Sequence, residues 1–188
     1  MKWTNRSKRF ELEALPHLPA LLRMARQLVP PGNAEDLVQE SFLRAWKYFD
    51  TFEKTTNCRA WLFRILRNVW IAQWRKGRLE LPVSDIEKDA LEPYYDWEDE
   101  FLAGELSAEV ACALSELPEE YRTALLLADV EEFAYKDIAH IMDCPIGTVM
   151  SRLNRGRRML GRLIRAKREG ARSGKQVGPR ERFHGREA

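Results

Sequence analysis

The chain has 188 residues, enough for one domain or two small ones, which excludes a large multidomain enzyme. Apolar residues make up 45% of the sequence and charged residues 32%, with 10 Gly and 9 Pro, which excludes a disordered or low-complexity chain. The formal net charge is only +2, but the charges are distributed unevenly along the chain.

Three helices are predicted in the first part of the chain. Apolar residues recur at helical spacing over Leu12–Val29, and Pro30 ends that pattern. A second helix is predicted over Asn33–Phe49, where Asn33 is a favourable N-cap residue. A third is predicted over Asn57–Gly77, and its expected core stripe is Leu62, Ile65, Leu66 and Val69.

The third helix combines aromatic rings with cations. Core packing is the better explanation for any single ring, but one short helix has little inner face for all of them. Rings interleaved with cations suit a nucleic-acid strand whose bases are unstacked. The rings are those of Trp61, Phe63, Trp70 and Trp74, with Phe52 in the preceding loop, and the cations are Arg59, Arg64, Arg67, Arg75 and Lys76.

The periodic pattern fades between Gly77 and Gly104. Pro82 and Pro93 would interrupt any helix there, and acidic residues accumulate. An irregular connection of about 25 residues is unusual inside a compact domain. We therefore expect an all-α protein of two small helical domains joined by an acidic linker.

The second part of the chain predicts a helix-turn-helix. Pro118 begins a first helix. A short helix over Tyr135–Met142, a turn at Asp143–Cys144 and a long helix from Pro145 to about Lys167 follow it. The residues expected to close the angle between the last two helices are Ile138, Met142, Ile146, Val149 and Leu153.

The outward face of the long helix carries the residue types that hydrogen-bond to base edges and phosphates in a DNA major groove. A solvated helix face is the alternative. With Ile146, Val149, Leu153 and Leu160 turned inward, the outward residues are Thr148, Ser151, Arg152, Asn154, Arg155 and Arg158.

The charge pattern supports two surfaces for a polyanion. Residues 1–79 carry 15 basic and 7 acidic side chains, and residues 151–188 carry 13 basic and 3 acidic ones. The 14 acidic residues and single Lys of residues 80–120 lie between them. Either basic block alone is explained by solvated helix faces, but the pairing of two blocks favours nucleic-acid binding.

Cysteine usage and hydropathy give no sign of a disulfide framework, a metal site or a membrane span. Cys58, Cys112 and Cys144 are an odd set without C-x-x-C spacing or a nearby His pair, so we expect buried or half-buried thiols and no zinc. No apolar run approaches the roughly 20 residues of a membrane-spanning helix. With no signal peptide after the basic N-terminus, we expect a cytoplasmic protein.

Four segments resemble motifs of the extracytoplasmic-function (ECF) sigma factors of the sigma-70 family. They are Asp36–Glu40, Arg59–Asn68, Leu117–Arg122 and Ile146–Leu153, and the resemblance extends over roughly Leu12–Leu163. Their number and order make it specific. The segment Ala128–Lys136 is most similar to the thiol-stress (SigR-like) branch of that family.

The resemblance implies a division of the chain into functional parts. Residues 1–78 would be a region-two domain and residues 79–104 an acidic linker. Residues 105–167 would be a region-four domain, and residues 168–188 a basic, disordered tail. Asp143 stands where many helix-turn-helix turns have Gly, which is tolerable because Asp enters the left-handed region more readily than most residues.

The resemblance also implies a function. The protein would bind core RNA polymerase, confer promoter specificity and help to melt promoter DNA, under the control of an anti-sigma factor that is often zinc-binding in the thiol-stress branch. Asp36, Gln39 and Glu40 would contact the polymerase. The minus-ten element would be melted and bound by Phe52, Asn57, Trp61, Asn68 and Gln73. The outward residues of the helix-turn-helix would read the minus-thirty-five element as duplex, and no cofactor is implied.

Two alternatives remain at the level of sequence. A repressor or activator that never engages polymerase would explain the helix-turn-helix equally well, but it leaves Asp36–Glu40 and the aromatic helix without a role. An enzyme would have to use the carboxylates of the acidic segment, and no nucleophile, acid pair or metal cluster accompanies them. Those carboxylates belong to Asp96, Glu98, Asp99 and Glu100.

Overall fold

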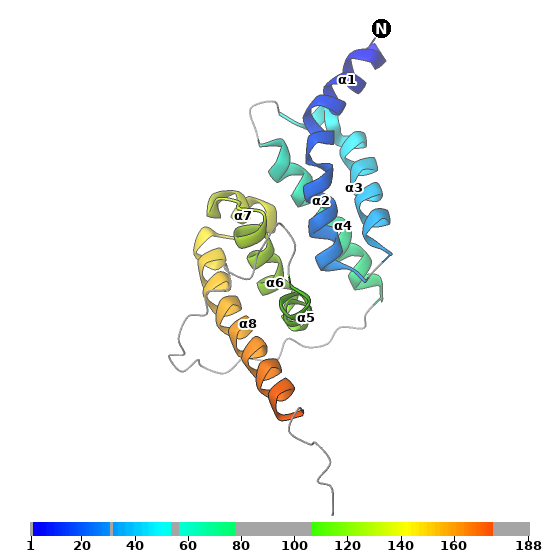
Figure 1. The fold of residues 1–188 in the computed structure, drawn as a ribbon. Coiled ribbons are helices and arrows are strands. Elements are labelled where there is room, and N and C mark those ends of the chain that lie inside the picture. Colours follow the sequence, from blue (N-terminus) through cyan, green and yellow to red (C-terminus); the bar gives the residue numbers. More distant parts are fainter. Residues whose placement is uncertain (1, 31, 54–56, 78–106, 175–188) are drawn as a thin grey trace, which may run out of the picture.

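The computed structural model describes residues 2–30, 32–53, 57–77 and 107–174, and every regular element in these ranges is helical, as the sequence predicts (Figure 1). The acidic linker, with the four carboxylates that an enzyme would need, lies outside the described residues. The first group of elements is α1 (Lys2–Ala14), the 3₁₀ turn η1 (Leu15–His17), α2 (Leu18–Leu28), α3 (Ala34–Tyr48), the 3₁₀ turn η2 (Phe49–Thr51) and α4 (Cys58–Gly77). The second group is α5 (Ala108–Glu116), α6 (Glu119–Leu125), the π-helical turn η4 (Leu126–Val130), α7 (Tyr135–Met142) and α8 (Ile146–Gly174).

The first predicted helix is interrupted in the structure. A 3₁₀ turn containing Pro16 separates α1 from α2 and changes the phase of the buried face. The expected stripe of Leu12, Leu15 and Leu18 is therefore exposed, with Leu12 at 77%. The buried residues of α1 and α2 are instead Phe10, Ala14, Leu21, Met24, Ala25 and Leu28.

Helices α2, α3 and α4 pack together around a core that the spacing predicts well. Leu37 of α3 and Leu62 and Leu66 of α4 are each 1% exposed. Asn33 occupies the N-cap position of α3, as expected, but its side chain makes no capping hydrogen bond. At the start of α4, the side-chain oxygen of Asn57 accepts a hydrogen bond from the Ala60 N–H at 3.2 Å.

The second group of helices is arranged around α8. Ser107 caps α5 by accepting a hydrogen bond from the Val110 N–H at 3.3 Å, and Pro118 takes the N-cap position of α6. Gly156 of α8 lies against α6, where an added Cβ would be 3.2 Å from Cβ of Tyr121. A side chain at this position would push α6 and α8 apart.

Three details differ from the sequence expectations. Ile146 is 46% exposed because it is the first residue of α8 and projects beyond the packed interface. Helix α8 continues to Gly174, and Arg168 donates a hydrogen bond to Glu109 at 2.9 Å, so residues 168–174 of the expected disordered tail are helical. Cys58 and Cys144 are half-buried as expected, but Cys112 is exposed.

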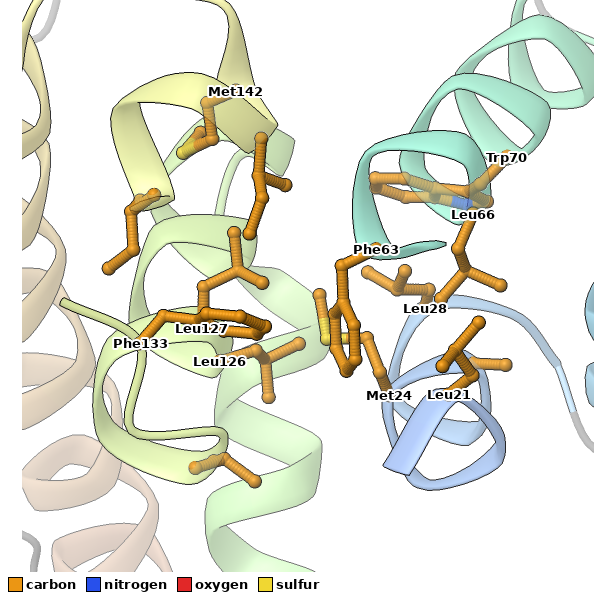
Figure 2. Close-up of a cluster of buried hydrophobic side chains, with 14 of the residues drawn as sticks. Leu21, Met24, Leu28, Phe63, Leu66, Trp70, Leu126, Leu127, Phe133 and Met142 are labelled. Carbon is orange, nitrogen blue, oxygen red and sulfur yellow. The ribbon is translucent and has the colours of Figure 1, made fainter. Parts of the chain in front are cut away.

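The two groups of helices share one core. Buried apolar side chains form a continuous cluster from Phe10 to Ile164. Figure 2 shows its central part, where Phe63 of α4 and Met24 of α2 point toward Leu126 and Phe133 of the second group. None of the described helices is long and apolar enough to cross a membrane.

Candidate nucleic-acid interface

Helices α7 and α8 form the predicted helix-turn-helix. Asp143 has φ 53° and ψ 51°, the left-handed conformation that ends α7 and reverses the chain. Ile138, Val149 and Leu153 are at most 2% exposed and fill the angle between the two helices. The turn chemistry and the buried contacts therefore fix the direction in which α8 projects.

The predicted DNA-reading residues of α8 divide into two groups. Ser151, Asn154 and Arg155 are exposed, whereas Thr148, Arg152 and Arg158 are half-buried. The hydroxyl of Ser151 donates a hydrogen bond to the Thr148 carbonyl at 2.9 Å. The three exposed side chains thus lie along the open face of α8.

Some cations of α8 serve the fold. Arg152 forms an ion pair with Glu120 of α6 at 3.6 Å and donates to the sulfur of Cys144 at 3.5 Å. Arg157 forms a two-pronged ion pair with Asp129, whose carboxylate is 5% exposed. Sequence reasoning left Arg157 unassigned, and its position between the outward residues Arg155 and Arg158 gave no sign of this partner.

The predicted minus-ten residues are spread along the start and length of α4. Phe52 is buried, with its ring centroid 4.9 Å from that of Trp61 and 6.0 Å from that of Phe49. Asn57 is exposed and caps α4, and Trp61 is half-buried. The structure therefore gives Phe52 and Asn57 local structural contacts, and Trp61 offers one partly open ring.

Asn68 and Gln73 lie farther along α4 and are both exposed. Asn68 is seven residues, or about two turns, beyond Trp61 and shares its face. Gln73 lies five residues beyond Asn68 and faces a different direction. The five predicted residues consequently do not form one contiguous patch.

A cleft of about 530 Å³ lies between the predicted minus-ten residues of the first group of helices and the helix-turn-helix of the second group. Phe52, Asn57 and Trp61 line one side of it. Lys136 and His140 of α7 line the other. In this conformation, the start of the helix-turn-helix thus lies beside the predicted minus-ten residues.

The exposed face of α3 carries the predicted polymerase contacts. Asp36 and Gln39 are exposed, and Glu40 is half-buried and paired with Arg44 at 2.7 Å. Next to them, Leu43 and Tyr48 are 59% and 51% exposed, which sequence reasoning did not single out. Both residues lie off the apolar stripe of α3, and apolar residues at such positions are the sequence signal that indicates a contact surface.

Burial, and after it the charge of Arg59, lowers the pKa of His17. Among the described residues, no group of His, Cys, Asp and Glu could hold a metal ion.

A helix-turn-helix with an exposed Ser, Asn and Arg face, joined to a bundle with an aromatic and basic helix, defines a DNA-binding transcription protein. Two family models match the chain: "Sigma-70 region 2" over residues 15–80 and "Sigma-70, region 4" over residues 107–160. The first match contains α3 and α4, and the second contains α7, the turn at Asp143 and the first half of α8.

Curated relatives extend the match over most of the chain. The "ECF RNA polymerase sigma factor EcfG" of Rhodopseudomonas palustris (strain TIE-1) is 37% identical over 155 residues, 81% of this chain and 83% of that protein. The "ECF RNA polymerase sigma-E factor" of Escherichia coli (strain K12) is 31% identical over 170 residues, 84% and 87% of the two chains.

Two solved structures share the fold. The sigma factor RpoE from Bartonella quintana, solved in complex with the anti-sigma factor NepR, is 36% identical with a TM-score of 0.67, covering 84% of this chain and 98% of that chain. CnrH, solved with the cytosolic domain of CnrY, is 25% identical with a TM-score of 0.63, covering 85% and 90%.

The chain belongs to the ECF sigma factors of the sigma-70 family. Its function is that of an alternative sigma factor in transcription initiation, which decides between the alternatives that the sequence left open.

Proposed function

We propose that this sigma factor docks on core RNA polymerase through the exposed face of α3 and reads its promoter through α4 and α8. Residues 1–78 and 105–167 are then its region-two and region-four domains, residues 79–104 connect them, and the rest is a basic tail. The observation that carries the proposal is the exposed face of α8, which the left-handed turn at Asp143 presents to solvent.

The roles follow from side-chain chemistry. Asp36, Gln39 and Glu40 contact the polymerase, and exposed Leu43 and Tyr48 add apolar area beside them. Of the six predicted residues of α8, the exposed Ser151, Asn154 and Arg155 contact the minus-thirty-five duplex directly, with Arg155 and Asn154 placed to read base edges. The half-buried Thr148, Arg152 and Arg158 flank that contact. Trp61 supports stacking with the melted minus-ten strand, while Asn68 and Gln73 add polar contacts and Phe52 and Asn57 hold the loop.

Run-off transcription from a pool of genomic promoters, with purified core polymerase, tests docking, recognition and melting together. We expect new discrete transcripts only when this protein is present. Asp36→Lys is expected to abolish them, because it reverses the charge of an exposed polymerase contact. Glu35→Lys is the control, because it reverses an adjacent exposed charge in the same first turn of α3 and perturbs the helix dipole to a similar extent. It also breaks an exposed ion pair with Arg26 at 3.5 Å, which is inside the first domain. Loss of the transcripts with both variants, or with neither variant, would contradict the assignment of Asp36 as a polymerase contact.

A second variant tests the reading face. Arg155→Ala is expected to weaken binding at one promoter position by about 1–3 kcal/mol. Affinities for a set of single-base promoter variants measure this effect. Equal loss of affinity on all sequences would instead make Arg155 a phosphate contact.

Control by an anti-sigma factor is the further part of the proposal. The RpoE structure, at 36% identity to this chain, was solved in complex with the anti-sigma factor NepR. Addition of the cognate anti-sigma factor is expected to abolish the run-off transcripts. The thiol-stress branch and a zinc-binding regulator stay predictions of the sequence, and the zinc content of the purified complex tests them.

A further inference from the structure

Glu131 is a buried carboxylate whose ion-pair partners, among the described residues, come from the other domain. It follows η4 in the second group of helices, and its side chain is 0% exposed. Arg23 of α2 binds both of its oxygens, with N–O distances of 2.8 and 2.9 Å. Arg59 of α4 donates to Oε2 at 2.6 Å.

The surroundings make this contact specific. The guanidinium of Arg59 also lies 4.3 Å from the ring centroid of Phe133, and that ring packs edge-on against Phe63 at 4.9 Å. Burial of a carboxylate is costly unless charged donors compensate for it. Glu131 can therefore be buried only when the two domains meet in this register.

The contact surface between the two domains, the seam, also pairs other cations of α4 with carboxylates of the second domain. Arg67 lies 3.6 Å from Glu119, and Arg64 lies 3.5 Å from Asp143. Together with Arg59, these cations lie on the helix that carries the proposed minus-ten contacts. The acids of the second domain thus occupy the positions at which α4 would otherwise attract phosphates.

We propose that Glu131 is a latch that, together with the apolar contact of Phe63 with Phe133, holds the two DNA-binding domains closed on one another and that nucleic acid must displace. In the closed state, Arg59, Arg64 and Arg67 of α4 are paired with carboxylates from within the chain. In the open state, Glu131 is hydrated and Arg23 and Arg59 are released, so opening exposes a basic face on the first domain. The inference concerns the conformation of the chain and goes beyond its assignment as a sigma factor.

Small-angle X-ray scattering of the full-length protein tests the closure directly. Glu131→Gln removes the negative charge of the latch, and Arg23→Gln removes one of the two positive charges that bind it. Each variant is expected to raise the radius of gyration by at least about a tenth. Arg26→Gln is the matched control. It lies one turn from Arg23 on α2, loses the same charge, and breaks only an exposed pair with Glu35 at 3.5 Å inside the first domain. Far-UV circular dichroism verifies that each variant keeps its helices.

Affinity for a fluorescein-labelled 30-nucleotide single strand of random sequence tests the inhibition. Removal of a cation should weaken binding to a polyanion, and Arg26→Gln is expected to do so. Arg23→Gln is expected instead to strengthen binding about threefold or more, because it frees the seam cations of α4.

The outcomes are separable. Unchanged scattering in both latch variants would overturn the latch, and opening without a gain in affinity would overturn the inhibition. Neither result depends on transcription, so failure of the proposed promoter contacts would leave the test intact.

Discussion

At the scale of single side chains, burial and neighbouring charges make the cysteine thiols of this protein unequal. Burial, and after it the carboxylate of Glu13, raises the pKa of the Cys58 thiol from an ordinary 9.0 to about 11, against a smaller opposing effect of Arg9. Cys58 is therefore almost entirely protonated at neutral pH. Cys112 is exposed and lies at 3.4 Å from the ammonium of Lys167.

Alkylation rates are expected to follow this difference. At pH 8 the raised pKa reduces the thiolate fraction of Cys58 roughly a hundredfold relative to the ordinary value. Iodoacetamide should modify Cys112 at least about tenfold faster than Cys58, as measured by peptide mass spectrometry. In denaturant the two rates should converge. Equal rates in the folded protein would show that Cys58 is not protected.

At the scale of elements, periodicity and turn chemistry predicted most of the fold. The bounds of α7 and the left-handed Asp143 agree with the expectations, because both depend on local residues. The break between α1 and α2 was missed, since Leu12, Leu15 and Leu18 continue a helical spacing across Pro16. The end of α8 was missed because Arg168 is held by Glu109, a contact between distant parts of the sequence.

The contact between α6 and α8 is expected to be sensitive to size. Gly156→Val places atoms where a Cβ alone would lie 3.2 Å from Tyr121 and 3.3 Å from Leu125. We expect this overpacking to cost about 1–3 kcal/mol of folding free energy, measured by thermal unfolding. Gly147→Val is the control on the same helix, because a Cβ added at Gly147 would meet no heavy atom within 4 Å. Equal melting temperatures for the two variants would contradict the tight contact.

At the scale of the whole molecule, the two domains are joined by one core. Sequence reasoning predicted two domains but not their contact. Glu131 lies in the acidic run Asp129–Glu132, which is typical of a solvated turn, yet its side chain is 0% exposed. Its partners are 72 and 108 residues away, beyond the reach of any local pattern. For the same reason, the sequence gave no sign of which cations pair within the fold, such as Arg157 with Asp129 or Arg152 with Glu120.

A shared core predicts cooperative unfolding. Differential scanning calorimetry of the full-length protein is expected to show one transition. Phe133→Ala removes a ring that is 6% exposed and packs on Phe63, and it is expected to split the trace into two transitions. Leu12→Ala truncates an apolar side chain that is 77% exposed and should leave one transition. Two transitions in the unmodified protein would contradict the shared core.

Helix α8 is a continuous rod of 29 residues, about 43 Å long at the usual rise per residue. Gly156, where α8 is in close contact with α6, is the point about which this rod can pivot. Ile146 lies about 15 Å from it on one side, and Arg168 lies about 18 Å from it on the other. Lys167 and Arg168 fasten the far arm to α5, whose cap Ser107 is the first described residue after the linker. A pull on the chain ahead of Ser107 is therefore delivered to Ile146 as a movement of nearly equal size in the opposite direction, to Ser151 as less than half of it and to Arg155 as almost none. Tension in the polypeptide can thus tilt the start of α8 while Arg155 stays nearly in place.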